Sequence, residues 1–380
     1  MKKKALFFSI FLLVFSNIIA QDEQDSTQKA GAYERIFDFG DQVVDLISTE
    51  KWAIIPALIY SPETSLGFGA RAIRVFRPNG ENSEKLRPSS LPITLVYTLN
   101  NQTIFTTELD LWSNENKDYF NTRIELSNFP FYFFGIGNDP LPIGKGERYG
   151  SRYLYFHLNY QRKIAKGLYI GPRYEFRADD IFDRVSGGLL ETSQISGYDG
   201  QLLSGIGLNL NHDTRDNIFQ PTKGWNNRLG WMGFTPLLGS NFTFNQYILD
   251  FRKYIRISKN QVLALQSWWS FTFGNPTFQH ISLIGGSDRM RGYFEGRYRD
   301  NHALVQQAEY RIPIHRNLGL VVFGHAGQVA SNPGNFSLKG MRYGGGFGFR
   351  YKINKEGLNI RFDIAFGDQT AFYFGLNEVI

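Results

Sequence analysis

The sequence predicts an all-β fold, a transmembrane antiparallel β-barrel of about 16 strands. Three observations predict it. Apolar and polar residues alternate along most of the chain, aromatic residues make up 16% of it, and no stretch after the N-terminus is long and apolar enough for a membrane helix. The mean hydropathy of −0.29 agrees, because each strand shows lipid an apolar face while its other face stays polar. The alternative with a similar composition is a soluble periplasmic β-sandwich.

The N-terminus, residues 1–20, predicts a secretory signal peptide. Lys2–Lys4 form its charged region and Ala5–Phe15 its apolar run, which ends in small residues before Gln21. A transmembrane anchor needs roughly 20 apolar residues, whereas this run is shorter and is soon followed by Asp22. We therefore expect export, cleavage and, for a barrel, residence in the outer membrane of a Gram-negative bacterium.

Residues 21–50 predict a short periplasmic segment, and residues 51–380 predict the barrel. The segment is polar and acidic at first, and Tyr33–Ser48 has the pattern of a short helix with one apolar side. Chains below about 40 residues seldom fold alone, so we interpret the segment as a tether or a short plug.

Charge and cysteine content exclude several other classes. The formal net charge of +6 includes Lys2–Lys4, and the remaining excess is too small to indicate nucleic-acid binding. The sequence has no cysteine, which excludes a lipoprotein anchor and a disulfide framework.

Alternation of apolar and polar residues divides the chain after residue 51 into about sixteen strands of the length that membrane barrels use. The predicted strands are Trp52–Tyr60, Leu66–Phe76, Leu91–Leu99, Thr103–Trp112, Tyr119–Ser127, Arg152–Lys163, Leu168–Arg177, Gln201–Asn211, Trp225–Phe234, Phe244–Ile257, Gln261–Phe273, Ala303–Ile314, Leu318–Val329, Arg342–Ile353, Leu358–Gly367 and Ala371–Ile380.

The connections between these strands alternate in length, which favours a barrel over a sandwich. Long outer loops and short inner turns are typical of outer-membrane barrels. The long connections are Phe129–Gly150, Asp179–Gly200, Asn275–Asn301 and Ala330–Gly340. The short ones are Ala165–Gly167, Ser258–Asn260, His315–Asn317 and Asn354–Gly357. The exception is the inner connection Pro78–Ser90, which is long.

The stretch Leu283–Arg299 sets arginines among glycines and aromatic residues, between two predicted strands. A phosphate-binding loop has a similar composition, since glycine-rich turns and arginine are natural anion ligands. The core of this stretch, Gly285–Tyr293, resembles the inward-folded loop motif of the BamA/TamA family of outer-membrane proteins. In that family an Arg-Gly-aromatic tripeptide folds back into the barrel, and its arginine meets a carboxylate on the inner wall. The resemblance implies an inward-folded sixth outer loop that carries Arg291, Gly292 and Tyr293.

The predicted partner of Arg291 is Asp363. In Leu358–Gly367 apolar residues alternate with polar ones, which turns Asp363 toward the lumen. A buried carboxylate needs a partner, and the placement of Asp363 also resembles the family's acceptor. The alternative is that these charges are ordinary in a water-filled lumen. The predicted loop lock, structural and conformational in role, consists of Arg291, Gly292, Tyr293 and Asp363.

A network around this lock is possible on neighbouring strands. Alternation in Arg342–Ile353 turns Arg350 and a row of glycines toward the lumen, which leaves room for a segment to lie against the backbone. The glycines are Gly344, Gly346 and Gly348. The strand after the loop adds Glu309 and Arg311, both facing the lumen.

The resemblance extends from about Trp52 to the end, and Asp213–Gly224 also resembles the family's inner turn before the ninth strand. Three departures stand out. We expect none of the soluble POTRA repeats that bind client chains in BamA and TamA, His325 stands where the family often carries an acid, and Phe372–Ile380 lacks the usual terminal aromatic residue. We interpret the sequence as a member reduced to its barrel.

Catalytic chemistry is not expected. The six histidines lack the close spacing of a metal site, and neither a phosphate-binding loop nor a nucleophile elbow is present. A barrel phospholipase could recruit His157 or His302, but nothing singles them out. We predict no enzyme activity, no catalytic residue, no cofactor and no metal.

The resemblance implies help with insertion or translocation of outer-membrane proteins. Expected partners are outer-membrane lipid, unfolded outer-membrane proteins and accessory proteins of the periplasm or outer membrane, with no nucleic acid. A weak seam between the first and last strands would template an incoming strand, and Pro56 and Pro62 limit ladder pairing there. The alternative is a passive pore or a surface protein without insertase activity.

Overall fold

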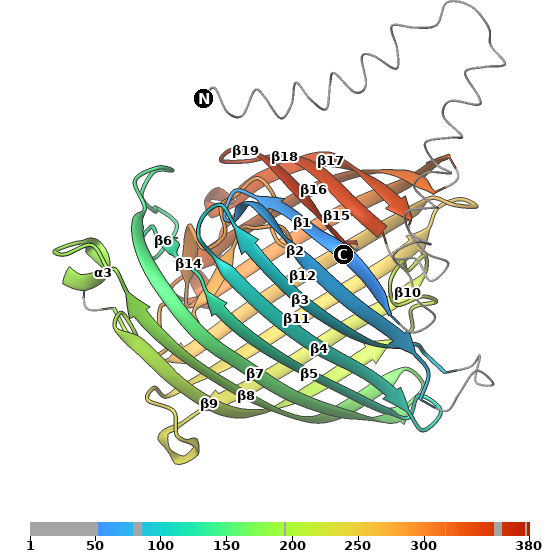
Figure 1. The fold of residues 1–380 in the computed structure, drawn as a ribbon, viewed down its shortest axis with the longest axis horizontal. Helices are drawn as coiled ribbons and strands as arrows, with labels where there is room; N and C mark the ends of the chain where they lie inside the picture. The colour runs from blue at the N-terminus through green and yellow to red at the C-terminus, as the bar shows by residue number, and fades with distance from the viewer. Residues whose placement is uncertain (1–51, 79–85, 194, 316, 353–358, 377) are drawn as a thin grey trace, which may run out of the picture. The chain divides into compact units, whose positions relative to one another are not determined.

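The structure, a computed structural model, describes residues 52–78, 86–193, 195–315, 317–352, 359–376 and 378–380. The predicted signal peptide and the segment 21–50 lie outside these residues. The described residues form a closed antiparallel barrel of sixteen long strands (Figure 1). No helix among them is long and apolar enough to cross a membrane.

Consecutive barrel strands pair with each other, and β1 pairs with β19 to close the sheet. The barrel strands are β1 (Ala53–Ser61), β2 (Ser65–Phe76), β3 (Ser89–Thr98), β4 (Thr103–Ser113), β5 (Asp118–Asn128), β7 (Glu147–Ala165), β8 (Leu168–Phe182), β9 (Gly200–Asp213), β10 (Gly224–Phe234), β11 (Phe244–Arg256), β12 (Val262–Gly274), β15 (His302–His315), β16 (Leu318–Ala330), β17 (Arg342–Lys352), β18 (Asn359–Phe366) and β19 (Thr370–Leu376). The loops hold β6 (Phe131–Phe133), β13 (Ser282–Ile284), β14 (Tyr298–Asp300), the short helix α3 (Leu189–Thr192) and single turns η1 to η3 (Pro236–Leu238, Pro333–Asn335 and Leu338–Gly340).

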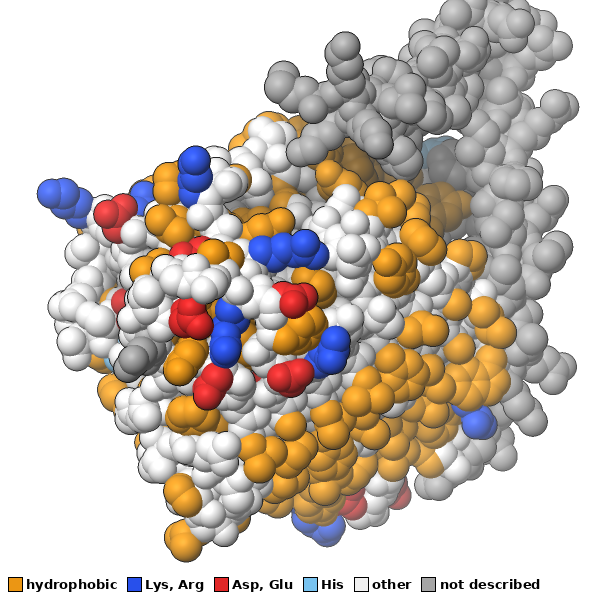
Figure 2. Space-filling view, turned by 60° about the vertical axis from the view of Figure 1, so that its left-hand side comes forward, with side chains coloured by type: hydrophobic (Ala, Val, Ile, Leu, Met, Phe, Trp, Pro, Cys, Tyr) orange, Lys and Arg blue, Asp and Glu red, His pale blue; other side chains and the backbone are white. Residues whose placement is uncertain are grey.

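The two faces of each strand differ as the alternation predicts. In β18, Arg361 and Asp363 are buried on the lumen side, whereas Ile360, Phe362 and Ile364 are more exposed on the other side. Figure 2 shows the result as a broad hydrophobic surface over the wall, with charged side chains gathered at its margins. An outward apolar band is what lipid requires, and the fold is therefore that of a transmembrane barrel.

Two strands run further than the sequence predicts. β7 starts at Glu147 rather than Arg152, and β8 continues to Phe182 rather than Arg177. The extensions bury apolar residues in a cluster with the loops, formed by Phe133, Tyr149, Ile181, Leu190 and Phe278. Burial in this cluster favours strand where the polar sequence alone indicates loop.

The last strand is shorter than predicted. β19 ends at Leu376, and Glu378–Ile380 turn into the lumen instead of continuing the strand to Ile380. Val379 and Ile380 pack there against Tyr254 and Ala264. Extended alternation would turn Glu378 outward with Leu376, and a carboxylate facing lipid is costly. That cost explains why the strand ends where it does.

The seam between β1 and β19 is the weakest joint of the barrel wall. β1 pairs with β2 over its whole length, from Ala53 opposite Ile73 to Ser61 opposite Ser65. On its other side the recorded pairing with β19 is Tyr60 opposite Phe374. The inward turn of the last residues removes the backbone that would extend this pairing.

The sixth loop, residues 275–301 between β12 and β15, folds into the barrel as predicted. Its residues Ile284, Met290 and Tyr298 are buried in a cluster with Trp268 and Val305 of the wall, the side chain of Met290 being fully enclosed. Other loops hold it from outside: Gly137 donates a backbone hydrogen bond to Arg299, and Arg297 pairs with Asp368. The loop is thus part of the packed interior.

Candidate functional site: the loop lock

Arg291 is aimed at the inner wall by a tight turn in the sixth loop. Its two neighbours, Met290 and Gly292, have φ angles of 61° and 95°, in the left-handed region. A Cβ atom on Gly292 would lie 2.8 Å from the carbonyl carbon of Phe366, so only glycine fits. The Gly292 N–H donates to the Tyr373 hydroxyl at 3.0 Å, which fixes the turn against β19.

The guanidinium of Arg291 binds two carboxylates of the wall. Its Nη1 donates to Asp363 at 2.6 Å, and its Nη2 donates to Glu309 at 2.5 Å. The same guanidinium lies over the Phe323 ring, 3.4 Å from its centroid. All three charged side chains are fully buried, so each depends on the others for its solvation. The structure brings the predicted pair Arg291 and Asp363 together.

These contacts belong to a closed ring of buried charges, here called the lumen ring. Arg350 donates to the second oxygen of Asp363 at 2.6 Å and to Glu378 at 2.8 Å. Arg311 lies 3.7 Å from Glu378 and 3.3 Å from Glu309, which completes the circuit. The lumen ring is Arg291, Asp363, Arg350, Glu378, Arg311 and Glu309. Three cations alternate with three anions, so each charge of the lumen ring has two opposite partners within the ring.

Sequence reasoning misses Glu378 as a member of this ring. Alternation predicts that Arg350 faces the lumen, and the structure agrees. The same alternation places Glu378 in the last strand, whereas in the structure that strand ends at Leu376. The signal was the lipid-facing position that an unbroken strand would give to this carboxylate. Glu378 also accepts a hydrogen bond from Asn359 of β18 at 2.8 Å.

The three lumen-facing glycines make room for side chains rather than for the loop backbone, contrary to expectation. A Cβ atom on Gly346 would lie 2.8 Å from the Phe323 ring that supports Arg291. One on Gly348 would collide with the Asp363 carboxylate, and one on Gly344 with His325. The glycine row therefore shapes the wall around the partners of the loop.

Tyr293 and His325 extend the lock toward the outer end. The Tyr293 hydroxyl donates to the backbone oxygen of Tyr343 at 2.7 Å. The His325 ring lies 6.3 Å from the Tyr293 ring and stacks on Phe323 at 6.1 Å between centroids. Where the family often has an acid, this chain thus has an aromatic contact.

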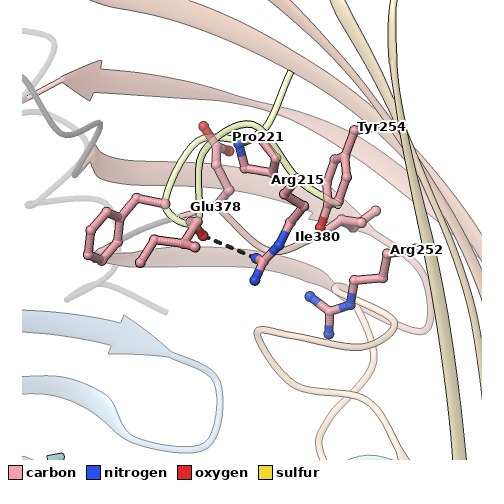
Figure 3. A pocket seen from close by; sticks show the side chains of 8 residues that line it. Arg215, Pro221, Arg252, Tyr254, Glu378 and Ile380 are labelled. Carbon is pink, nitrogen blue, oxygen red and sulfur yellow. Dashed lines mark hydrogen bonds between the residues drawn. The ribbon is translucent and has the colours of Figure 1, made fainter. Parts of the chain in front are cut away.

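A small pocket of about 180 Å³ lies beside the lumen ring. Arg215 and Pro221 from the inner turn, Arg252 and Tyr254 from β11, and the end of the chain line it (Figure 3). Both arginines are already paired, Arg215 with Asp213 and Arg252 with Asp250. The pocket therefore marks where the last residues meet the inner turn.

The side chains of the site offer noncovalent binding through buried ion pairs and hydrogen bonds. Among the described residues, no group of three or more His, Cys, Asp or Glu side chains is arranged to hold a metal ion. The ring residues pair with one another, which suits a lock that holds the loop.

Fold and site together define a class of protein: transmembrane β-barrels in which one loop is folded back and bound to the inner wall. Residues 90–379 match the Omp85 superfamily domain. Since this match covers most of the chain, the protein belongs to the Omp85 superfamily.

Three known proteins show the range of similarity. A stretch of 153 residues is 26% identical to outer envelope protein 39 of the Arabidopsis thaliana chloroplast, and it spans 38% of this chain and 42% of that protein. BamA from Haemophilus ducreyi lacking POTRA domains 1–3 matches with a TM-score of 0.55 and 14% identity, over 87% of this chain and 70% of that one. CdiB from Escherichia coli matches with a TM-score of 0.57 and 9% identity, over 87% and 63%. The two structural matches show a shared fold.

Proposed function

We propose that the protein is an insertase or translocator of the Omp85 type that resides in the bacterial outer membrane. The observation that carries the proposal is the seam, where the described residues of β1 and β19 pair at Tyr60 opposite Phe374 alone. Membership of the superfamily supports the same reading. The partners of this function are outer-membrane lipid, unfolded outer-membrane proteins and accessory proteins, and no residue acts as a catalyst.

The seam supplies a template for an incoming strand. Backbone N–H and C=O groups along an open strand edge recruit another strand by hydrogen bonding. In β1 that edge runs from Ala53 to Ile59, for which no pairing with the described residues of β19 is found. An unfolded barrel strand that binds there would begin to fold at the membrane, without a soluble intermediate.

The loop lock keeps the wall beside the seam in shape while the edge is open. Arg291 reaches β15 through Glu309 and β18 through Asp363, and Gly292 reaches β19 through Tyr373. These contacts brace the strands that end at the seam.

A disulfide staple across the seam tests the proposal. The natural chain has no cysteine, so Tyr60→Cys with Phe374→Cys would give a single cross-link. The matched control is Leu58→Cys with Phe68→Cys, which joins β1 to β2 where pairing is already complete. The measurement is the folding rate of an outer-membrane protein client in proteoliposomes that contain each oxidised variant, with reduced samples as reference.

We expect the seam staple to abolish assisted folding and the control staple to leave it intact, with recovery on reduction. Equal client folding in the stapled and reduced seam variants would reject the template. In that case single-channel conductance decides whether the barrel is the alternative, a passive pore or surface protein. Recovery in the soluble periplasmic fraction would reject the outer-membrane location.

A further inference from the structure

The outward face of the barrel carries a groove of about 540 Å³. Three strands form its floor, with Leu265 of β12 opposite Ala308 of β15, and Ala308 opposite Gly324 of β16. Phe251 borders it on β11. Small side chains next to large ones leave this hollow in a wall that is otherwise covered by bulky apolar residues.

The floor of the groove is nearly free of unsatisfied polar groups. The Gln306 amide donates to the Ser267 hydroxyl at 2.8 Å, and the Trp269 indole donates to the same hydroxyl at 2.9 Å. Gly324 is open above, since a Cβ atom there would meet only the Gly344 oxygen, at 3.9 Å. An apolar chain in the groove would therefore cover two side-chain donors that are already paired.

The end of the groove nearest the inner turns carries a cation. Lys253 lies opposite Trp225, and its ammonium nitrogen is 4.0 Å from the centre of the indole ring. The pair sits at the inner end of the wall, because β10 starts at Gly224 and β11 ends at Arg256. Tryptophan and lysine at this level are typical of the boundary between hydrocarbon and headgroups. No ion pair with Lys253 is recorded among the described residues.

We propose that this groove binds one phospholipid of the inner leaflet. The phosphate binds the Lys253 ammonium beside the Trp225 ring, and an acyl chain lies along the floor formed by Leu265, Ala308 and Gly324. The volume falls within the roughly 300–1,000 Å³ of ligand sites, and such sites combine apolar lining with few polar groups. Anionic headgroups are attracted by a basic residue at this level.

Native mass spectrometry of the full chain in mild detergent tests the site. The probe is dioleoyl phosphatidylglycerol, compared with dioleoyl glycerol, which has the same chains and no phosphate. Lys253→Met removes the cation and Gly324→Leu fills the groove. The matched controls are Lys223→Met in the neighbouring turn and Val322→Leu. Val322 is the next residue of β16 that faces outward from the barrel. A heat-modifiable gel band confirms that each variant is folded.

We expect the wild type to retain one phosphatidylglycerol, and Lys253→Met to weaken this binding about tenfold, the loss of a charge-assisted contact. Binding of dioleoyl glycerol should be unchanged by Lys253→Met, whereas Gly324→Leu should lower the binding of both lipids. The controls should behave as the wild type. Equal retention of phosphatidylglycerol by folded Lys253→Met, folded Gly324→Leu and wild type would overturn the proposal. So would equal retention of both lipids by the wild type.

Discussion

Arg291 and Arg350 share the carboxylate of Asp363, one guanidinium on each oxygen, both at 2.6 Å. The sharing ties the sixth loop to β17 through a residue of β18. It also makes the lumen ring redundant, because the loss of one member leaves each neighbour with at least one partner, and Asp363 also has Arg361 at 3.7 Å. Removal of a single charge should therefore cost less than it would in an isolated buried pair.

The first prediction concerns Arg291 and Asp363 together. Arg291→Ala and Asp363→Ala should each lower the free energy of unfolding by about 3 kcal/mol, the lower end of the cost of breaking a buried ion pair. The double variant should cost clearly less than the sum of the two single variants, because the contact between Arg291 and Asp363 is lost in both of them. Protease cleavage within residues 275–301 and loss of the heat-modifiable band in urea measure the effect.

Arg289 provides the control for this cycle. It lies in the same loop, over the Trp268 ring at 4.1 Å, and outside the lumen ring. The losses in free energy of unfolding caused by Arg289→Ala and Asp363→Ala should add more nearly than those caused by Arg291→Ala and Asp363→Ala. Strict additivity of the Arg291 and Asp363 effects would show that their contact does not hold the loop.

The sequence predicts some residues of the lumen ring and misses others. Two separate patterns place the lock, since alternation turns Asp363 inward and the loop motif supplies Arg291. Arg350 is also placed by alternation, but its partner Glu378 is not, because the periodic pattern continues past the point where the strand ends. The ends of β7 and β19 likewise depend on burial against distant residues, which local periodicity does not contain.

The second prediction concerns Glu378. Glu378→Gln should lower the free energy that keeps residues 378–380 in the lumen by about 1.5–3 kcal/mol, the value of a hydrogen bond to a charged group. Val379→Cys can report this, because the natural chain has no cysteine and a thiol-reactive probe would label one site. Labelling should be faster in the Glu378→Gln background. Glu115→Gln, whose side chain is 84% exposed in an inner turn, should leave labelling unchanged.

The third prediction concerns the backbone of Gly292. Gly292→Ala forces a Cβ atom to 2.8 Å from Phe366 in a left-handed conformation, and strain of this kind costs roughly 1–3 kcal/mol. The tripeptide Arg291–Tyr293 should move away from β19, and amide hydrogen exchange in residues 286–298 should become faster. Gly334→Ala is the matched control, because its Cβ atom would meet nothing within 4 Å. Unchanged exchange in Gly292→Ala would contradict the tight fit.

The last prediction concerns pH and the inner turn between β9 and β10. Asp216 accepts backbone hydrogen bonds from Thr222 at 2.9 Å and from Lys223 at 3.2 Å. Burial raises the pKa of Asp216, but these hydrogen bonds and that of the Thr222 hydroxyl outweigh it and hold the pKa below the ordinary 3.8. Because the folded pKa is depressed, the stabilisation is present above the unfolded pKa and is lost as pH falls through the folded value.

Amide exchange in residues 214–223, corrected for the intrinsic rate, should therefore accelerate below about pH 4, the ordinary titration range of Asp. Asp216→Asn should flatten this dependence, because its side chain keeps an acceptor oxygen and has no charge to titrate. The neighbouring Asp213 is paired with Arg215 and Arg87 in both proteins, so the difference between the two pH profiles reports Asp216. If the wild type and Asp216→Asn share one pH profile, Asp216 does not hold the turn.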